Sequence, residues 1–257
     1  MTPAPQIPRT ALVTGGAKRI GAAIVEALAD LGFAVAIHYR DSRAEAEALA
    51  AKIAGKGGKA VAIGADLAKE GEVVALAKAS LDALGPLGVL VNNASEFERD
   101  EVCDVTRASW DRHMETNLRA PFVLAQAMAD VLPVDAEGVI VNMIDQRVWN
   151  LTPHFTTYTL SKAGLWTLTQ TMALALAPRV RVNAIGPGPT LKSVRQDPEQ
   201  FARQVASVPL RRGPALDEIA ACVRFILASP SLTGQMIALD GGQHLNWGTP
   251  GAHQPKE

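Results

Sequence analysis

The sequence predicts one α/β domain with a doubly wound fold, in which seven parallel strands form a sheet that helices cover on both faces. Short runs of β-branched and apolar residues alternate with longer Ala- and Leu-rich segments of helical periodicity. This alternation is typical of repeated β-α-β units, whose strands are buried on both faces. The chain has 257 residues, 48% of them hydrophobic, and no linker interrupts it, so we expect one shared core.

Each strand is expected where an apolar run is short, and each helix where apolar residues recur every three or four positions. The expected strands are 10–13, 34–38, 60–64, 89–91, 139–143, 181–185 and 236–239. The expected helices are 20–31, 43–54, 70–84, 110–132, 158–177 and 217–228. Asp217 is the expected N-cap of the last helix.

One connection and the two ends of the chain follow neither period. Residues 186–214 are rich in Pro, Gly and Arg and are long for a connection in a compact domain, so we expect them to form an irregular substrate-binding loop. Residues 1–8 contain three prolines and are expected to be a flexible tail. The domain itself is expected to span 9–247, with 248–257 as a second tail.

Composition and charge exclude several classes of protein. The 25 Lys and Arg residues against 26 Asp and Glu residues give a net charge of −1, which argues against a nucleic-acid partner. Cys103 and Cys222 lie far apart without a CxxC motif or clustered His, so we expect neither a disulfide nor a metal site. Without a signal peptide or an apolar run of about 18 residues, the chain is expected to be cytoplasmic and to have no membrane partner.

A glycine-rich turn, Thr14-Gly15-Gly16-Ala17-Lys18-Arg19-Ile20-Gly21, follows the first expected strand and leads into a helix. Glycine lets the backbone approach a pyrophosphate, and a helix N-terminus supplies free N–H groups and a favourable dipole. A turn of this kind also occurs as a simple strand-to-helix connection. Its position between strand and helix favours nucleotide binding.

The end of the second expected strand reads His38-Tyr39-Arg40-Asp41-Ser42. NAD-binding folds usually place an acidic residue at this strand end, where it accepts hydrogen bonds from ribose hydroxyls. Here the strand end is not acidic, and Lys18, Arg19 and Arg40 supply cations where a 2′-phosphate would lie, which favours NADPH. Asp41 keeps NADH as the alternative, but we expect this residue to start the next helix.

Tyr158 and Lys162 are spaced i and i+4 in one expected helix, so their side chains project from the same face. An exposed pair on a helix has the same spacing. A nearby ammonium would favour the phenolate and lower the pKa of the phenol from its usual value of about 10. We therefore expect Tyr158 to act as a general acid and Lys162 to tune its pKa.

With these motifs, the sequence resembles the short-chain dehydrogenase/reductase family over about residues 10–242. The resemblance implies a Rossmann fold, a nicotinamide cofactor, a small-molecule substrate and a homotetramer. It also implies that Lys162 anchors the nicotinamide ribose, and that Asn117 helps to hold Lys162 and a water. The matching motifs are Thr14-Gly15 with Gly21, Asp66-Leu67, Asn92-Asn93-Ala94, Asn117, Tyr158-Thr159-Leu160-Ser161-Lys162, Pro187-Gly188-Pro189-Thr190 and Asp240-Gly241-Gly242.

Three departures from the common pattern of that family are similar to its pteridine reductase branch, which includes bacterial dihydropteridine and dihydromonapterin reductases. Arg19 stands where most members have a glycine, and Ser95 follows Asn-Asn-Ala where most have Gly. Asp145 stands thirteen residues before Tyr158, where most have the catalytic Ser.

Asp145 decides the expected substrate class. A carboxylate beside a developing oxyanion would oppose ketone reduction unless it were protonated. Reduction of a C=N bond in a pterin instead needs a proton on the ring nitrogen, which a carboxylic acid or a carboxylate-held water can supply. A structural substitution in a protein that has lost the chemistry is the other interpretation, and the retained Asn117, Tyr158 and Lys162 argue against it.

The same resemblance implies further contacts. Phe97 corresponds to the aromatic residue that stacks on the pterin. Ser95 and Arg19 would bond the polar edge of the pterin or the cofactor phosphates, and Phe155 and Phe201 would line the substrate pocket. His113 is expected to be structural. The implied cofactor contacts are Gly15, Lys18, Arg19, Ile20, Gly21, His38, Tyr39, Arg40, Ser42, Asp66, Leu67, Asn93, Ala94, Ser95, Tyr158, Lys162, Pro187, Gly188 and, at the nicotinamide carboxamide, Thr190.

Taken together, the sequence predicts an NADPH-dependent reductase of a pteridine ring. The expected substrates are dihydromonapterin or dihydrobiopterin, reduced to the tetrahydro form, with dihydrofolate as a further candidate. A generic NADPH-dependent carbonyl or 3-oxoacyl reductase is the first alternative. A non-catalytic NADPH-binding regulator is the second, and the retained Tyr158 and Lys162 argue against it.

Overall fold

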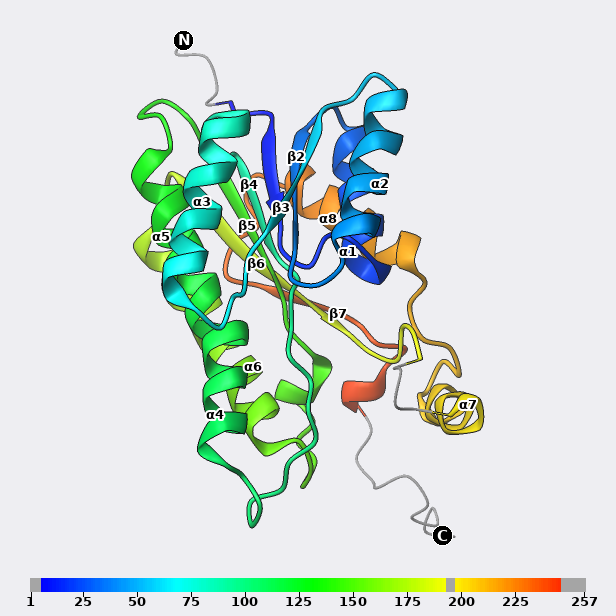
Figure 1. Ribbon diagram of the computed structural model, residues 1–257. Helices are drawn as coiled ribbons and strands as arrows, with labels where there is room; N and C mark the ends of the chain where they lie inside the picture. The colour runs from blue at the N-terminus through cyan, green and yellow to red at the C-terminus, as the bar shows by residue number, and fades with distance from the viewer. Residues whose placement is uncertain (1–5, 193–196, 246–257) are drawn as a thin grey trace, which may run out of the picture.

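The computed structural model describes residues 6–192 and 197–245 and confirms the predicted fold class. In this part of the chain, one parallel sheet has the order β3-β2-β1-β4-β5-β6-β7 (Figure 1). The chain winds outward from β1 to β3 and then returns to β4, so the sheet has a switch point between β1 and β4. The strands are β1 (Thr10–Val13), β2 (Ala34–Tyr39), β3 (Ala60–Gly64), β4 (Val89–Asn92), β5 (Gly138–Met143), β6 (Val180–Pro187) and β7 (Met236–Leu239).

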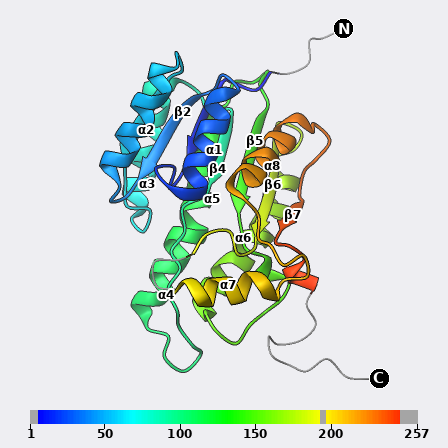
Figure 2. The ribbon, with the colours of Figure 1, turned by 90° about the vertical axis from the view of Figure 1, so that its right-hand side faces the viewer.

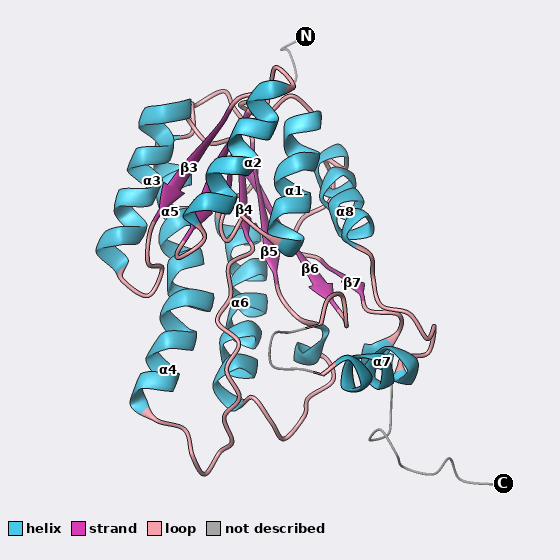
Figure 3. Cartoon of the chain, turned by 45° about the vertical axis from the view of Figure 1, so that its right-hand side comes forward, coloured by secondary structure: helices cyan, strands magenta, loops and turns pink. Residues whose placement is uncertain are grey.

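Helices cover both faces of the sheet (Figures 1 and 3). One layer contains α1 (Arg19–Asp30), α2 (Arg43–Gly55) and α8 (Leu216–Ala228). The other contains α3 (Glu70–Leu84), α5 (Ala120–Val131) and α6 (Thr156–Ala175), and α4 (Arg107–Met114) extends this layer beyond the sheet. A further helix, α7 (Pro198–Ser207), lies beyond the carboxyl ends of the strands (Figure 2).

The core consists of two main apolar clusters, one on each face of the sheet. Successive strand residues point to opposite faces, so Val13 and Val91 pack toward α1 and α8, whereas Leu12 and Leu90 pack toward α3 and α5. All four side chains are fully buried. Because both faces are covered, the strands read as nearly continuous apolar runs, which is why the sequence predicts them well.

The single helix predicted at 110–132 is interrupted. α4 passes into a π-helical turn, η1 (Glu115–Arg119), before α5 begins. A π-turn inserts an extra residue without breaking the apolar periodicity on either side, so the sequence pattern did not reveal it. Asn117 lies in this turn.

The roles predicted for two acidic residues at helix N-termini, Asp217 and Asp41, were wrong. Ala215 is the N-cap of α8, and the Glu218 carboxylate accepts the Ala215 N–H at 2.7 Å. Ser42 is the N-cap of α2, and Asp41 instead accepts a hydrogen bond from Arg40 Nε at 2.8 Å. Acidic residues are favoured throughout the first turn of a helix by its dipole, so Asp217 fits there without capping the end.

The connection 186–214 was predicted as irregular, and the structure corrects this. β6 continues to Pro187, and α7 begins after Asp197, whose carboxylate accepts the Gln200 N–H at 2.7 Å. α7 has only ten residues and two large apolar side chains, Phe201 and Val205, and none of its residues is buried, so no apolar run marks it as a helix. Residues 193–196 lie outside the described residues.

The last three residues of the predicted N-terminal tail are ordered against the domain. Gln6 forms a parallel β-bridge with Ala136, and the Pro8 carbonyl lies against Gly88. The prediction of a flexible tail was therefore wrong for residues 6–8, because backbone pairing was not visible in the composition. Residues 1–5 and the predicted tail 248–257 lie outside the described residues.

Gly88 gives a test of this packing. A Cβ at Gly88 would overlap the Pro8 carbonyl oxygen and lie 2.8 Å from Ile7 Cγ2, so we expect Gly88→Ala to lower the free energy of unfolding by roughly 1–3 kcal/mol. Gly71→Ala is the matched control, because Gly71 lies inside α3 with nothing within 4 Å, and there alanine should raise stability by about 0.5–1 kcal/mol. Urea unfolding measures both, and a Gly88→Ala variant as stable as wild type would contradict the contact.

Candidate active site

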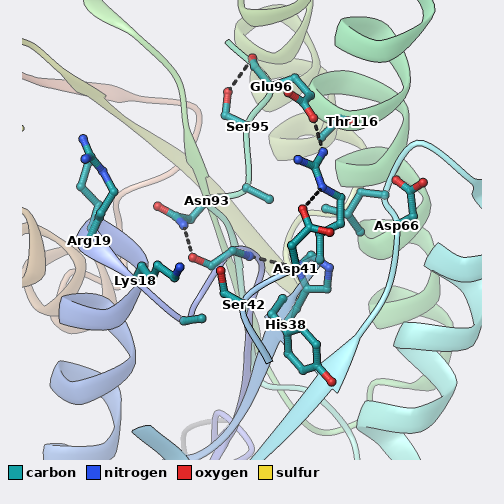
Figure 4. A pocket seen from close by; sticks show the side chains of 18 residues that line it. Lys18, Arg19, His38, Asp41, Ser42, Asp66, Asn93, Ser95, Glu96 and Thr116 are labelled. Carbon is teal, nitrogen blue, oxygen red and sulfur yellow. Dashed lines mark hydrogen bonds and ion pairs between the residues drawn. The ribbon is translucent and has the colours of Figure 1, made fainter. Parts of the chain in front are cut away.

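Most of the predicted cofactor residues gather around one cavity of about 390 Å³ at the carboxyl ends of β1, β2 and β4 (Figure 4). This is the switch point of the sheet, where doubly wound folds bind ligands. Five predicted residues, Tyr158, Lys162, Pro187, Gly188 and Thr190, do not line it. The predicted residues that do are Gly15, Lys18, Arg19, Ile20, Gly21, His38, Tyr39, Arg40, Ser42, Asp66, Leu67, Asn93, Ala94 and Ser95.

Four lining residues were absent from the predicted set: Ala17, Asp41, Glu96 and Thr116. Each is the sequence neighbour of a predicted site residue, and that adjacency is the signal that could have found them. Glu96 matters most, because its carboxylate is an ion-pair partner of Arg40.

Hydrogen bonds tie the glycine-rich turn to the segment after β4. Asn93 Nδ2 donates to the Thr14 and Gly15 carbonyl oxygens at 2.9 and 3.0 Å. The Thr14 hydroxyl accepts the N–H groups of Asn93 and Ala94 at 2.9 and 3.0 Å. A Cβ at Gly21 would overlap the Gly15 carbonyl oxygen and lie 2.7 Å from Asn93 Nδ2. Glycine is therefore required where α1 approaches the turn.

His38 holds the glycine-rich turn in place from inside the protein. Its Nδ1 accepts the Gly15 N–H at 3.0 Å, and its Nε2 lies 3.0 Å from the Ala65 carbonyl oxygen. Burial lowers the pKa of His38, so the neutral ring makes both bonds at neutral pH. Both ring nitrogens thus bond to the protein itself, although the residue also borders the cavity.

The three predicted cations all have partners within the protein. Lys18 pairs with Glu45 at 2.6 Å, and Arg40 pairs with Asp41 and Glu96. Arg19 has a left-handed backbone with φ of 55°, consistent with its place at a glycine position of the family pattern. Its guanidinium donates to the carbonyl oxygens of residues 191 and 192 at 3.1 and 3.0 Å and points away from Lys18 (Figure 4).

The predicted catalytic residues Asp145, Tyr158 and Lys162 come together at the same end of the sheet as this cavity. The Tyr158 hydroxyl donates to Asp145 Oδ2 at 2.9 Å, and Asp145 Oδ1 accepts the Arg147 N–H at 2.8 Å. Lys162 is buried under the Tyr158 ring, and its Nζ donates to the Met143 carbonyl oxygen at 2.8 Å. A phenol, a carboxylate and an ammonium thus share one enclosed space.

The expected lowering of the Tyr158 pKa was wrong. Burial, the charge of Asp145 and the hydrogen bond to it raise the pKa of Tyr158 well above its usual value. Burial also lowers the pKa of Lys162 to about 8, although the charge of Asp145 partly opposes that shift. The sequence spacing placed the Lys162 ammonium near Tyr158 but showed neither the burial of the phenol nor the Asp145 carboxylate beside it. Burial and this carboxylate dominate the pKa of Tyr158. Tyr158 therefore keeps its proton and shares it with Asp145.

Asn117 holds the segment that follows β4. Its Oδ1 accepts the Glu96 N–H at 2.8 Å, and its Nδ2 donates to the Glu96 carbonyl and to the Ser161 hydroxyl, each at 3.0 Å. The π-turn aims this amide at both partners. In the structure Asn117 thus connects the Glu96 backbone to α6. Its partner on that helix is Ser161, the residue before Lys162.

Predicted substrate aromatics form a stack beside the catalytic group. The Phe97 ring lies parallel to the Phe155 ring at 4.6 Å and edge-on to the Tyr158 ring at 4.6 Å. The Arg147 guanidinium covers the Phe155 ring at 4.8 Å. Phe155 has a left-handed backbone with φ of 62°, an uncommon conformation for a bulky residue that here precedes the first residue of α6.

The remaining predicted residues lie in three places: 187–190 at and after the end of β6, 201 on α7, and Ser95 at the cavity. Pro187 ends β6, the Gly188 N–H donates to the Leu239 carbonyl oxygen at 2.9 Å, and the Thr190 hydroxyl donates to the Gly188 carbonyl at 3.1 Å. Phe201 lies on α7, and Ser95 donates from its hydroxyl to the Glu96 carbonyl at 3.2 Å.

No three His, Cys, Asp or Glu side chains gather to hold a metal ion in residues 6–192 and 197–245. No helix in the described parts of the chain combines the length and apolarity that a bilayer crossing requires.

Comparison with known proteins places this geometry among dehydrogenases and reductases. A model of the short-chain dehydrogenase/reductase family, described as Enoyl-(Acyl carrier protein) reductase, matches residues 15–244. Among curated relatives, a 3-oxoacyl-[acyl-carrier-protein] reductase from Synechocystis is 32% identical over 91% of this chain and 96% of its own length.

Two solved structures are more similar in sequence. The FolM alternative dihydrofolate reductase 1 from Brucella canis, complexed with NADP, is 55% identical with a TM-score of 0.91, covering 95% of this chain and 97% of that chain. The corresponding protein from Brucella suis, in complex with NADP, is 56% identical with a TM-score of 0.91, covering 94% and 97%.

The lowered pKa of Lys162 gives a stability test. The unfolded chain holds the Lys162 proton up to about pH 10.5 and the folded chain only to about 8, so between these values the unfolded state binds more protons and stability rises with pH. Across this window, we expect the free energy of unfolding of wild type to rise by up to roughly 3 kcal/mol relative to that of Lys162→Met. Urea unfolding of both proteins across the window measures this, because other titrating groups cancel in the difference. A constant difference would contradict the burial cost.

Proposed function

This chain belongs to the short-chain dehydrogenase/reductase family and is an NADP-dependent oxidoreductase, and from that premise we propose that it reduces the pteridine ring of a dihydropterin. Dihydromonapterin and dihydrobiopterin, converted to the tetrahydro form, are the proposed substrates, and dihydrofolate is a further candidate. The observation that carries the proposal is the hydrogen bond from the Tyr158 hydroxyl to Asp145 at 2.9 Å.

The cavity fits NADPH. Gly15 has φ of 59°, and a Cβ there would lie 3.0 Å from Ala94 Cα, so only glycine lets the turn pack this closely on the segment after β4. The turn borders the cavity and leads into the N-terminus of α1, where a pyrophosphate would bind. Arg40, Lys18 and Ser42 would hold the 2′-phosphate, and Lys162 the nicotinamide ribose. When bound, NADPH supplies the hydride. The Brucella structures contain NADP, which supports this choice of cofactor.

Asp145 and Tyr158 supply the proton that the ring nitrogen needs. Reduction of a C=N bond adds a hydride to the ring carbon and a proton to the ring nitrogen, so the site must hold a proton donor at neutral pH. The raised pKa keeps Tyr158 protonated, and Asp145 accepts its O–H. The proton reaches the ring nitrogen from this pair through water, and solvent replaces it. A ketone would instead develop an oxyanion next to the Asp145 carboxylate, which opposes that reaction.

Phe97 supplies a flat surface beside this pair. Its ring is partly exposed and edge-on to Tyr158, so a planar bicyclic ring that stacks on it lies beside the phenol. The similarity to two proteins described as alternative dihydrofolate reductases supports a pterin, since dihydrofolate contains that ring. From the family resemblance, we also propose a cytoplasmic homotetramer.

Turnover assays test the proposal directly. We expect NADPH oxidation by purified protein with dihydromonapterin or dihydrobiopterin, and little with an acetoacetyl thioester. Turnover of the thioester alone would support a 3-oxoacyl reductase, the activity of the Synechocystis relative, and would contradict the proposal. No turnover of any substrate, with NADPH bound, would support a non-catalytic regulator.

Asp145→Ser separates the two chemistries. Because serine supplies an uncharged donor and removes the acceptor of the Tyr158 proton, we expect kcat/KM for the dihydropterin to fall by about 100-fold or more. Reduction of the thioester should be unchanged or increase. Equal loss of both activities would contradict the role of Asp145, and NADPH binding by calorimetry controls for folding.

Arg40→Met tests the cofactor preference. Removing a charged hydrogen-bond donor to the 2′-phosphate should weaken NADP⁺ binding by roughly tenfold or more, with no change for NAD⁺. Arg9→Met is the matched control, because Arg9 covers the Phe33 ring at the amino end of β1, away from the cavity. Calorimetric titration measures all four dissociation constants. Unchanged NADP⁺ affinity in Arg40→Met would exclude Arg40 as the phosphate ligand.

A further inference from the structure

A buried polar cluster joins the segment that carries Phe97 to the start of the helix that carries Tyr158. We call it the Asp100 cluster; it consists of Asp100 in the segment between β4 and α4, Ser109 and His113 on α4, and Thr157 on α6. Asp100 is 5% exposed, and His113 and Thr157 are fully buried. The reaction outlined above uses none of these residues.

Asp100 binds the first turn of α6 through both its backbone and its side chain. Its carbonyl oxygen accepts the N–H groups of Phe155 and Thr156 at 2.9 and 3.3 Å. Its Oδ1 accepts the Thr157 N–H at 3.1 Å, and its Oδ2 accepts the hydroxyls of Thr157 and, at 2.7 Å, Ser109. Asp100 thus satisfies N–H groups that the start of a helix leaves without partners, immediately before Tyr158.

His113 extends these bonds to the segment after β4. Its Nε2 accepts the Glu98 N–H at 3.1 Å, so the neutral ring carries its proton on Nδ1. Nδ1 lies 2.7 Å from the Thr157 hydroxyl oxygen, which in turn donates to Asp100, and 3.0 Å from the Ser109 carbonyl oxygen. One continuous series of hydrogen bonds therefore runs from the backbone of Glu98 to Asp100 through His113 and Thr157.

Phe97 lies between two anchored neighbours. Asn117 bonds both backbone groups of Glu96, and His113 bonds the backbone N–H of Glu98. The segment has no regular secondary structure of its own, so these side chains supply what a helix or strand would otherwise supply. The same cluster sets the start of α6, and the Phe97 and Tyr158 rings end 4.6 Å apart.

Hydrogen bonds keep the buried Asp100 side chain in its carboxylate form. Burial alone would raise the pKa of Asp100, but the hydrogen bonds from Thr157 and Ser109 outweigh it and leave the pKa below its ordinary value. A buried, fully bonded polar network is rigid but contributes little net stability compared with apolar packing of the same volume. Its position next to both rings therefore indicates a role in geometry.

We propose that Asp100, His113 and Thr157 are positioning residues that set the spacing between Phe97 and Tyr158 and thereby the affinity for the flat substrate ring. None of the three lines the cofactor cavity. The identity of the ring rests on the proposed function, whereas the spacing is a property of the protein without substrate. The proposed function and the proposed positioning role can therefore be disproved separately.

Thr157→Val tests the cluster with the smallest change, because it replaces only the hydroxyl between His113 and Asp100. We expect amide hydrogen exchange at Glu98 and at Phe155–Thr157 to accelerate by roughly tenfold, as for one lost hydrogen bond. We expect KM for the dihydropterin to rise by a similar factor, with kcat within about twofold and the NADPH dissociation constant unchanged. Unchanged exchange would overturn the proposal whether or not any dihydropterin is reduced.

Thr169→Val is the matched control. Thr169 is equally buried on the same helix, and its hydroxyl accepts Asn142 Nδ2 at 2.8 Å, away from the cluster. It should lose stability as Thr157→Val does but leave the exchange at Glu98 and the KM unchanged. Equal effects of both variants on KM would show that the loss follows general destabilisation and would overturn the proposal.

A second pair keeps the test decisive if Thr157→Val does not fold. The amide of His113→Gln extends to the Nε2 position and can accept the Glu98 N–H, whereas the shorter His113→Asn reaches only the Nδ1 position. We expect faster exchange at Glu98 and a raised KM in His113→Asn, with substantial rescue in His113→Gln. Identical behaviour of the two variants would overturn the proposal. Failure of wild type to reduce dihydropterins would count against the proposed function only, since exchange still decides the cluster.

Discussion

Backbone hydrogen bonds align β1, β4 and β5 so that Val13, Val91 and Val141 lie side by side at the centre of the sheet. Because the strands are parallel, the chain leaves each of them at the same edge, and the glycine-rich turn meets the Asn93 segment there. Inside the sheet, Asn92 bonds Asn142, which bonds Thr169, each at 2.8 Å. These bonds attach α6 to the central strands. The positions of the cavity, the catalytic helix and the aromatic stack all follow from this alignment.

The three residues proposed for catalysis, Asp145, Tyr158 and Lys162, combine charges that burial disfavours. Lys162 is nearly inaccessible and its pKa falls to about 8, while Tyr158 gives up its proton less readily than a phenol in water. Asp145 is the charge that links them, because it accepts the hydrogen bond of the Tyr158 hydroxyl and favours the Lys162 ammonium. The result is a site that stores a proton next to an aromatic surface. Such a site suits a ring nitrogen better than a developing oxyanion.

Sequence motifs identified most of the residues that line the cavity, because each motif is a short run at the end of a strand. Parallel strands bring such runs to one edge, so knowing the strands was almost enough to assemble the cavity. Elements that depend on distant contacts were missed. The π-turn at Asn117 and the pairing of Gln6 leave no clear period in the chain, and α7 is short and mostly polar. Glu96 was overlooked because its importance comes from Arg40, which follows β2, whereas Glu96 follows β4.

By itself, the sequence determined the fold class, the family and the set of residues at the carboxyl edge of the sheet, because apolar periodicity and glycine placement are local properties. Only the tertiary structure decided the electrostatics. Burial and the approach of Asp145 reversed the expected pKa shift of Tyr158, and Arg40 gained carboxylate partners. It also decided how Phe97 is held, through His113 and Asp100. These properties depend on distances between segments far apart in the chain, and a one-dimensional pattern carries no such distances.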